Sequence, residues 1–141
     1  MNIAFFLTPK INVAYLNVGD SIRQGLEKFR RYGYTALPVL NDEGKYVGFI
    51  SEGDFLRNIL SIGSIDLRDM EQAKIDDIIH KEEFSVKITS SMDDLVSSAL
   101  DRNFIPVTDD RDLFMGIVTR RSILEYFFKN YIKCKEVQKS I

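Results

Sequence analysis

The sequence predicts an α+β protein built from two similar units, each a small β-sheet packed against two helices, with the units related by pseudo-two-fold symmetry. The main observation is an internal repeat: residues 103–128 resemble residues 35–60, with Pro106 at the position of Pro38. In addition, each copy alternates β-rich runs, turn residues and helical periodicity. Two similar units that face each other leave a cleft with two related pockets.

Each copy is expected to run as strand, helix, strand, turn, strand and helix. The first strand and the start of the first helix extend the repeat toward the N-terminus, where residues 16–22 match residues 86–92. The segment from Val86 to Pro106 is two residues shorter than the equivalent segment of the first copy, from Leu16 to Pro38. The second copy therefore lacks a pair of residues within or just after its first helix.

The first helix of the first copy has clear expected ends. Ser21-x-x-Gln24 is a capping box, in which each residue satisfies a free N–H group of the other, and Gly33 is a C-terminal stop. The equivalent helix of the second copy begins at Ser91 and is expected to end near Asn103.

Two strands around a polar turn follow in each copy, and a closing helix comes after them. The expected strands are residues 36–40 and 46–50 in the first copy, and residues 104–108 and 113–118 in the second. Pro38 and Pro106 stand early in their strands. A proline without an N–H donor at this place predicts an edge strand or a strand that begins at a pocket.

We expect four segments along the chain: a first repeat, a polar linker with helical character after Asp66, a second repeat and a helical extension. Their bounds are residues 3–60, 61–74, 75–128 and 129–141. The last helix carries an apolar stripe at i, i+3, i+4 spacing, made of Tyr126, Phe127, Phe128, Tyr131 and Ile132. This stripe either covers the core of its own unit or meets a second protomer.

The composition is that of a water-soluble globular protein, with 45% hydrophobic and 28% charged residues among 141. The formal net charge of −2 argues against a nucleic-acid binder, whose binding face is usually basic. No apolar run is long enough to span a bilayer, and the first residues lack the basic region of a signal peptide. We therefore expect neither nucleic acid nor membrane as a partner, and a location in the cytoplasm.

The sequence offers no catalytic or metal-binding set. Cys134 and His80 are each the single residue of their type, which leaves no disulfide and no typical zinc site within one chain. The sequence contains no phosphate-binding Gly-rich loop, no dinucleotide fingerprint and no nucleophile elbow. We expect a protein that is not an enzyme and carries no cofactor.

Ser51 and Asp54 stand where the last strand of the first copy passes into its closing helix. A Ser-x-x-Asp pair at such a junction is a common capping box with no role beyond stability. The same geometry also offers a hydroxyl and free N–H groups to an anion, and a carboxylate that accepts hydrogen bonds from both hydroxyls of a ribose. Spacing alone leaves both interpretations open.

The equivalent junction of the second copy reads Thr119-Arg120-Arg121. Thr119 suits the N-cap position. The two arginines oppose the positive end of the helix dipole, where acidic residues are favoured and where the first copy has Glu52. A bound anion would resolve the conflict, since guanidinium groups match phosphate oxygens. The alternative is that both side chains extend into solvent or pair with nearby acidic residues.

The entry to the middle strand of the first copy, from Tyr34 to Pro38, is the third candidate. Small and apolar residues there, beside backbone groups that Pro38 leaves unpaired, suit a flat purine and the reading of its edge. The alternative is an ordinary start of a strand.

Each copy has a hydrophobic-Pro-Val strand entry and a Gly-hydrophobic-hydrophobic-Ser/Thr strand end, and this duplicated pattern resembles a pair of CBS domains (cystathionine-β-synthase-type regulatory modules). The resemblance covers residues 3–60 and 75–128. It implies a stand-alone CBS pair that forms homodimers and holds adenosine-nucleotide sites in its central cleft. The Ser/Thr-x-x-Asp motif of the family is present as Ser51-x-x-Asp54, but Ser122 replaces the aspartate in the second copy.

The segments around Ala14, Thr35 and Arg121 resemble, more narrowly, small CBS-pair proteins of Gram-positive bacteria that act as receptors for cyclic di-AMP. This resemblance implies a regulatory sensor that modulates an unidentified partner protein. The adenine base is expected at Ala14 and residues 35–37, and the phosphodiesters at Arg120 and Arg121. The expected site comprises Val13, Ala14, Tyr34, Thr35, Ala36, Leu37, Pro38, Ser51, Asp54, Ile105, Pro106, Thr119, Arg120 and Arg121. The alternatives are AMP or ATP as the ligand, or a ligand-free dimeric adaptor.

Overall fold

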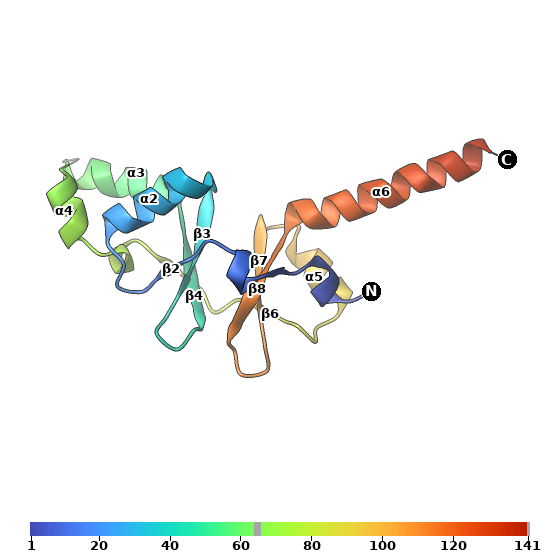
Figure 1. Ribbon diagram of the computed structural model, residues 1–141, viewed down its shortest axis with the longest axis horizontal. Helices are drawn as coiled ribbons and strands as arrows, with labels where there is room; N and C mark the ends of the chain where they lie inside the picture. Colours follow the sequence, from blue (N-terminus) through green and yellow to red (C-terminus); the bar gives the residue numbers. More distant parts are fainter. Residues whose placement is uncertain (64–65, 141) are drawn as a thin grey trace.

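The computed structural model describes residues 1–63 and 66–140, and it confirms the α+β class with two related units (Figure 1). Each unit contains a four-stranded sheet. In spatial order, the strands of the first sheet are β2 (Leu16–Asn17), β3 (Ala36–Leu40), β4 (Tyr46–Ser51) and β5 (His80–Lys81). Those of the second sheet are β1 (Thr8–Pro9), β8 (Phe114–Thr119), β7 (Phe104–Thr108) and β6 (Val86–Lys87).

The two sheets repeat each other in pairing as well as in sequence. β2 and β3 are parallel, as are β6 and β7, whereas β3–β4 and β7–β8 are antiparallel hairpins. An irregular step in register after Val39 recurs after Val107. The repeat seen in the sequence therefore corresponds to one backbone geometry used twice.

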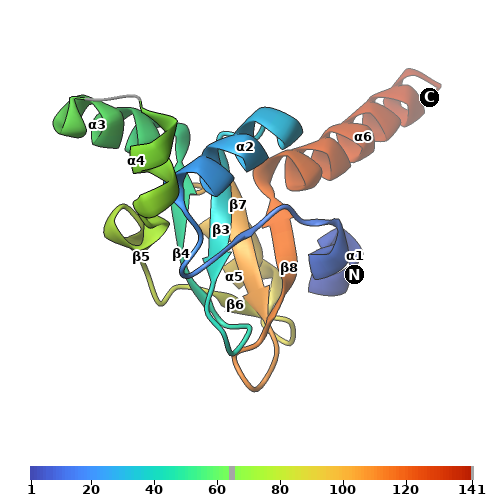
Figure 2. The same ribbon diagram turned by 60° about the vertical axis from the view of Figure 1, so that its left-hand side comes forward.

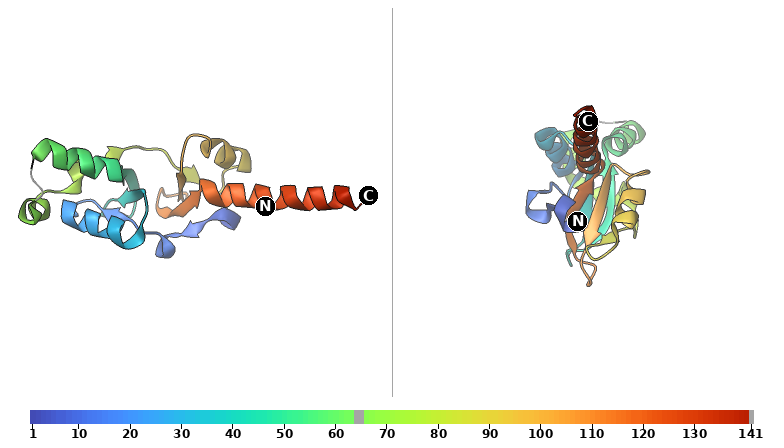
Figure 3. Two further views of the ribbon diagram at one scale, coloured as in Figure 1. Left: turned by 90° about the horizontal axis from the view of Figure 1, so that it is seen from above. Right: turned by 90° about the vertical axis from the view of Figure 1, so that its right-hand side faces the viewer.

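The helices pack around the sheets. In chain order they are α1 (Ile3–Phe6), η1 (Lys10–Asn12), α2 (Ile22–Tyr32), α3 (Glu52–Ile62), α4 (Leu67–Gln72), η2 (Ile75–Asp77), α5 (Met92–Ser98) and α6 (Arg120–Lys139). α2, α3 and α4 lie with the first sheet, and α1, α5 and the start of α6 lie with the second (Figures 1 and 2). The C-terminal half of α6 projects away from the rest of the molecule (Figure 3). None of the helices described has the length and apolar character needed to cross a membrane.

Each sheet takes one edge strand from the segment that leads into the other copy. β1 pairs with β8, where Pro9 lies opposite Gly116, and β5 pairs with β4, where Lys81 lies opposite Gly48. A Cβ at either glycine would lie 2.1 Å from a carbonyl oxygen of the exchanged strand. The exchanged strands tie the two units together, so the units in space do not coincide with the repeats along the chain.

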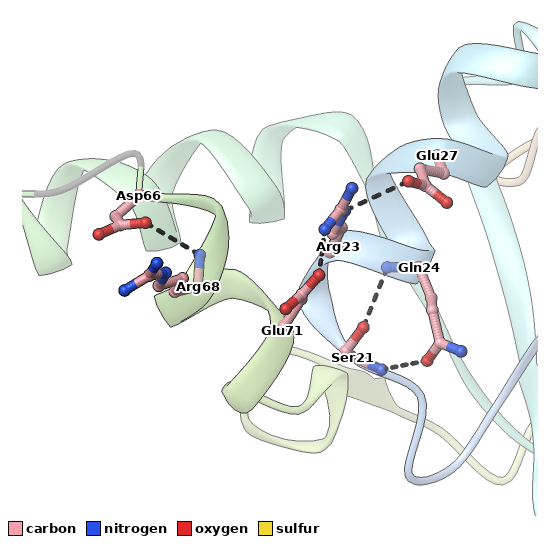
Figure 4. A network of polar contacts seen from close by, with 7 residues as sticks. All are labelled: Ser21, Arg23, Gln24, Glu27, Asp66, Arg68 and Glu71. Atoms are coloured by element: carbon pink, nitrogen blue, oxygen red, sulfur yellow. Dashed lines mark hydrogen bonds and ion pairs between the residues drawn. The ribbon is translucent and has the colours of Figure 1, made fainter.

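The start of α2 is fixed by the capping box expected from the sequence. Ser21 Oγ accepts a hydrogen bond from the N–H of Gln24 at 3.1 Å, and Gln24 Oε1 accepts one from the N–H of Ser21 at 2.8 Å (Figure 4). Arg23 bonds both Glu27 of the same helix and Glu71 of α4. The capped end of α2 therefore also holds α4 in place.

Helix α5 is shorter than expected, since it ends at Ser98 and not near Asn103. The hydroxyls of Ser97 and Ser98 both donate to the carbonyl oxygen of Asp94, in competition with the N–H groups of the helix. The shortening of the second copy thus falls at this helix, whereas α2 ends at Gly33 as predicted.

The prolines of the repeat do not mark edge strands, and that part of the prediction is wrong. β3 and β7 each lie between two other strands. Parallel pairing of β3 begins at Val39, one residue beyond Pro38, and that of β7 begins at Val107, one residue beyond Pro106. The sheet therefore does not need the N–H donor that each proline lacks.

The helix expected after Asp66 is confirmed as α4. The side chain of Asp66 accepts a hydrogen bond from the N–H of Arg68 at 2.9 Å and caps the helix (Figure 4). Residues 64–65 of the expected linker, and residue 141 of the expected extension, lie outside the described residues.

The apolar stripe of α6 covers the core of its own unit only at its start. Ile123 is buried, and Tyr126 packs edge-to-face against Phe5 and Phe6, with ring centroids 5.6 and 5.4 Å apart. The remaining members of the stripe are exposed: Phe127, Phe128, Tyr131 and Ile132. The interpretation that the whole stripe covers its own unit is therefore wrong.

A small apolar cluster joins the two units where their hairpins meet. Leu40, Tyr46 and Phe114 are buried there, and the Tyr46 and Phe114 rings stack with centroids 6.3 Å apart. The N–H of Phe114 also donates to the carbonyl oxygen of Gly44 at 3.0 Å. This cluster and the exchanged strands set the distance between the sheets.

Replacing Gly116 with alanine is expected to lower the free energy of unfolding by about 1 to 3 kcal/mol, because its positive φ disfavours a side chain and the Cβ meets a carbonyl oxygen. Gly19→Ala is the control, since Gly19 also has a positive φ, of 93°, but nothing lies within 4 Å of its Cβ position. Urea unfolding followed by circular dichroism measures both. Equal losses in the two variants would contradict the importance of the close approach.

Candidate functional site

A cavity of about 200 Å³, which we call the first cleft, opens between the two units. Its walls come from the segment before β2, from the start of β3 and the loop that precedes it, and from the hairpin strands of the second sheet. The lining residues are Thr8, Asn12, Val13, Ala14, Tyr34, Thr35, Ala36, Pro38, Asn103, Phe104, Ile117 and Thr119.

The first cleft is a slot with small residues in its walls. Ala14 and Ala36 carry only a methyl group, which leaves the slot open. Tyr34 stands at the rim, where its ring is stacked on that of Tyr32 with centroids 6.2 Å apart and planes at 9°. Such a slot suits a flat ring, and the asparagine and threonine side chains of the lining can bond to the edge of that ring.

A second space of about 630 Å³, the outer hollow, lies beside the first cleft, since Asn103 and Thr119 line both. The other residues around it are Arg120, Arg121, Leu124, Glu125 and Phe128, all from the start of α6. Guanidinium groups and the positive end of the helix dipole therefore stand at the mouth of the first cleft.

The two arginines at the start of α6 are held differently. Arg120 donates from Nε to the carbonyl oxygen of Ala99 at 2.7 Å and from Nη2 to that of Leu100 at 3.3 Å, so it caps the end of α5. The side chain of Arg121 is 88% exposed and bonds Glu125 at 2.9 Å, a surface pair that costs little to break. The hydrogen bond to Glu125 raises the pKa of Arg121. Arg121 is thus a charged side chain that is free to reach a ligand.

Thr119 acts as the N-cap of α6. Its Oγ1 accepts a hydrogen bond from the N–H of Ser122 at 3.1 Å, and the hydroxyl of Ser122 turns back to the carbonyl oxygen of Thr119. The first turn of α6 holds no acidic residue, whereas that of α3 holds Glu52 and Asp54. The two junctions therefore differ in charge as the sequence indicates.

Ser51 and Asp54 lie outside the first cleft and the outer hollow. The buried carboxylate of Asp54 accepts hydrogen bonds from the N–H and hydroxyl of Ser51, from Arg57 at 2.7 Å and from His80 Nε2 at 2.6 Å. Burial alone would raise the pKa of Asp54, but these hydrogen bonds lower it below its usual value. In this structure Asp54 joins α3 to β5 and lines neither of these two spaces.

Seven of the residues expected at the site line the first cleft, and Arg120 and Arg121 line the outer hollow. The seven are Val13, Ala14, Tyr34, Thr35, Ala36, Pro38 and Thr119. Besides Ser51 and Asp54, the remaining ones are Leu37 and Ile105, which are fully buried in the cores of their units, and Pro106, which is also buried. Because alternate residues of a strand face opposite sides, Leu37 points away from the cleft that Ala36 and Pro38 line.

Sequence reasoning missed five lining residues: Thr8, Asn12, Asn103, Phe104 and Ile117. The repeat contained a signal for two of them, since Asn103 and Phe104 are the equivalents of Thr35 and Ala36. Ile117 follows from strand alternation, two residues before Thr119. Thr8 reaches the cleft through the exchange of β1, which no local pattern reveals.

Comparison with known proteins places the chain among CBS domains over most of its length. The CBS domain family model matches twice, at residues 7–61 and 75–129. Cyclic di-AMP receptor B of Bacillus subtilis is 24% identical over 125 residues, which are 89% of this chain and 85% of that protein.

Solved structures of related proteins share the fold. The CbpB protein of Listeria monocytogenes in complex with c-di-AMP superposes with a TM-score of 0.81 at 28% identity, over 94% of this chain and 98% of that one. A crystal structure of CbpB in complex with c-di-AMP has a TM-score of 0.83 at 24% identity, over 96% and 90% of the two chains. The same two-unit architecture therefore spans nearly the whole chain.

Replacing Asp54 with asparagine is expected to lower the free energy of unfolding by about 1 to 3 kcal/mol at pH 7, because the hydrogen bonds from Arg57 and His80 lose their charged acceptor. Since the pKa of Asp54 is lower in the folded protein than its usual 3.8, the contribution is complete above this value and is lost as the pH falls below it. Urea unfolding of both proteins between pH 7 and pH 3 measures the difference, which should narrow at the acid end.

Asp110→Asn is the matched control, because Asp110 is an exposed residue of the β7–β8 turn. This variant should unfold like the wild type at every pH. A difference between Asp54→Asn and the wild type that stays constant down to pH 3 would show that the charge of Asp54 adds nothing to stability.

Proposed function

The chain belongs to the CBS domain family, and on that basis we propose that it is a regulatory sensor that binds an adenine nucleotide, cyclic di-AMP, in the first cleft. The observation that carries this proposal is the adjacency of the two spaces: a slot for a flat base lies beside a hollow that is lined by two arginines at the start of α6. The likeness to a cyclic di-AMP receptor and to a complex with c-di-AMP supports the same ligand.

The sizes of the two spaces favour a dinucleotide. The first cleft, at about 200 Å³, is smaller than typical ligand pockets of roughly 300–1,000 Å³ and suits one nucleoside. The outer hollow is a shallow space of about 630 Å³, and it presents Leu124 and Phe128 to a second base. The two phosphodiesters then lie between the bases, close to Arg120 and Arg121.

The charge at the start of α6 also favours a phosphodiester. Ser122 replaces the aspartate that would accept hydrogen bonds from a ribose, and Arg121 has only to leave Glu125 to reach a phosphate oxygen. We propose that the ligand contacts the predicted site residues that line the two spaces, and also two asparagines of the lining. These residues are Asn12, Val13, Ala14, Tyr34, Thr35, Ala36, Pro38, Asn103, Thr119, Arg120 and Arg121.

We propose regulation, and not catalysis, as the role. Within residues 1–63 and 66–140, no three His, Cys, Asp or Glu side chains gather as a metal site. The lining of the two spaces contains a single carboxylate, Glu125, and neither histidine nor cysteine. Because the lining comes from both units, a bound nucleotide bridges them. Occupied and empty forms then differ in affinity for a partner protein, which is what signalling requires.

For the chain as a whole we propose the four segments expected from its sequence, at residues 3–60, 61–74, 75–128 and 129–141. The family matches at residues 7–61 and 75–129 support this division. We propose the cytoplasm as the location, since a nucleotide sensor has to meet its ligand there.

We propose a homodimer formed through exposed apolar side chains of α3 and α6. Leu56 and Leu60 of α3 are 59% and 71% exposed, and Phe127 and Tyr131 of α6 are 47% and 56% exposed. The two helices lie along the same edge of the molecule (Figures 1 and 2). Monomeric proteins rarely leave so much apolar surface uncovered, and two-fold dimers are the commonest assemblies.

Arg121→Ala is expected to weaken cyclic di-AMP binding by about 10- to 100-fold, because a charge-assisted hydrogen bond to phosphate contributes about 1.5 to 3 kcal/mol. Titration calorimetry with cyclic di-AMP, AMP and ATP measures the effect. Arg111→Ala is the control, since it removes the same side chain from the exposed β7–β8 turn and should leave binding unchanged.

The other outcomes separate the alternatives. Binding of AMP that survives Arg121→Ala, with no binding of cyclic di-AMP, would replace the proposed ligand with a mononucleotide. Binding of none of the three nucleotides would favour the ligand-free adaptor. A thermal-shift assay gives an independent reading, since a ligand at 100 times its dissociation constant stabilises a one-site protein by about 2.7 kcal/mol.

Leu60→Glu is expected to convert the dimer to a monomer, because it places a charge in the apolar contact. Light scattering after size exclusion should give a mass near 16.3 kDa for this variant and twice that for the wild type. Ile11→Glu, at a position that is 91% exposed in η1, makes the same kind of change away from α3 and α6 and should remain dimeric. A monomeric wild type would refute the proposed dimer.

A further inference from the structure

The molecule contains a hollow that is the pseudo-two-fold mate of the first cleft, and we call it the second cleft. It has about 370 Å³ and is lined by Ala36, Phe49, Glu82, Asp101, Arg102, Asn103 and Phe104. The register of the repeat relates Glu82, Phe84 and Arg102 to Asn12, Ala14 and Tyr34 of the first cleft. At these three positions the two clefts have different kinds of side chain.

The side chains at these three positions block the inner end of the second cleft, whereas its outer part stays open. Arg102 and Glu82 form a two-point ion pair, with Nη1–Oε1 and Nη2–Oε2 distances of 2.9 and 2.5 Å. Tyr46 donates a hydrogen bond from its hydroxyl to the same carboxylate. The guanidinium group of Arg102 lies over the ring of Phe84, 3.8 Å from its centre. A phenyl ring and an ion pair thus stand where the first cleft has a methyl group and an open rim.

As a result, the second cleft lacks the inner part of the first. Pro38 and Thr119 line the first cleft, but their equivalents, Pro106 and Ser51, do not line the second. The hydroxyl of Ser51 donates to Asp54 instead, and that carboxylate is also held by side chains of α3 and β5. The acceptor that a ribose would need is turned inward.

The two clefts also differ in the charge of the residues around them. α6 presents Arg120 and Arg121 to the outer hollow beside the first cleft, whereas the equivalent positions at the start of α3 are Glu52 and Gly53. The lining of the second cleft itself contains two carboxylates, Glu82 and Asp101, against the one guanidinium group of Arg102. A phosphodiester placed there would meet negative charge, which is unfavourable.

The hydrogen-bonded side chains at the blocked end of the second cleft come from both units. Tyr46 belongs to β4, Glu82 follows β5, and Arg102 comes just before β7. We call these three side chains the brace. Burial, followed by the hydrogen bond to Glu82, raises the pKa of Tyr46, so its hydroxyl stays a donor. Burial alone would raise the pKa of Glu82, but hydrogen bonds from Arg102 and Tyr46 lower it, so the ion pair persists at neutral pH.

We propose that the chain binds one nucleotide, in the first cleft, and that the second cleft takes none, because Phe84 and the brace block its inner end. The brace also links the two units. The assignment of the nucleotide rests on the proposed function, whereas the closure of the second cleft rests on the contacts above. One duplicated backbone thus yields one binding site and one structural site.

Titration calorimetry of the wild type with cyclic di-AMP counts the sites, and we expect one nucleotide per chain. Ala14→Phe gives the first cleft the phenyl ring that Phe84 provides in the second. It should weaken this binding by about 10- to 100-fold, because the larger side chain overfills the space. Two nucleotides per chain would overturn the inference and leave the proposed function in place. No binding of cyclic di-AMP, AMP or ATP would overturn the proposed function and, with it, the assignment of the first cleft.

The closure of the second cleft has a separate test, made in the Ala14→Phe background, which blocks the first cleft. Adenosine is the probe, because it carries no phosphate to meet the acidic start of α3. Adding Glu82→Asn, Phe84→Ala and Arg102→Tyr gives the second cleft the residues that the first cleft has at the equivalent positions. None of the three substituted residues lines the first cleft itself. The combined variant should gain one adenosine site that its parent lacks. Adenosine binding by the parent, or a folded combined variant without a new site, would overturn the closure.

The brace can also be tested without any ligand, which keeps the proposal falsifiable if the combined variant does not fold. Arg102→Gln should lower the melting temperature by about 3 to 8 °C, because it leaves the carboxylate of Glu82 without its charged partner. Arg111→Gln, on the exposed turn, is the matched control and should melt like the wild type. An unchanged melting temperature for Arg102→Gln would overturn the brace.

Discussion

Both sheets of this protein include an edge strand that comes from the segment leading into the other copy, and this exchange depends on two glycines. β1 reaches β8 only because Gly116 has no side chain, and β5 reaches β4 only because Gly48 has none. The exchanged strands fix how the two units face each other. The apolar cluster between the hairpins, the first cleft and the brace all lie between the units, so each of them depends on that arrangement.

Within this frame, the duplicated backbone offers two equivalent clefts, and side chains make them unequal. Ala14 keeps the first cleft open, whereas Phe84 fills the corresponding place in the second, beneath the guanidinium group of Arg102. The charges change in the same direction, from arginines at the start of α6 to carboxylates around the second cleft. A gene duplication can in this way keep the stability of a symmetric fold while only one half of the symmetry is used for a ligand.

Helix α6 connects the features that a sensor needs. It begins in the outer hollow, where Arg121 forms a surface pair with Glu125, and it continues into the exposed stripe that includes Phe127 and Tyr131. In the proposed assembly, one helix therefore carries both the arginines that we propose to bind phosphate and part of the proposed dimer contact. A ligand that shifts the start of α6 acts directly on that contact, without a chain of intermediate residues.

Most of the fold and about half of the site could be predicted, because their signals are local. The capping box at Ser21, the alternation of the strands and the conflict between Arg121 and the helix dipole are all visible in a few adjacent residues. The tertiary structure alone decided which distant groups meet. It brings Thr8 into the first cleft, turns Asp54 toward His80, and places Glu82 between Tyr46 and Arg102. Such contacts depend on how the exchanged strands place the two units relative to each other. No local pattern in the chain encodes the distance between the two sheets.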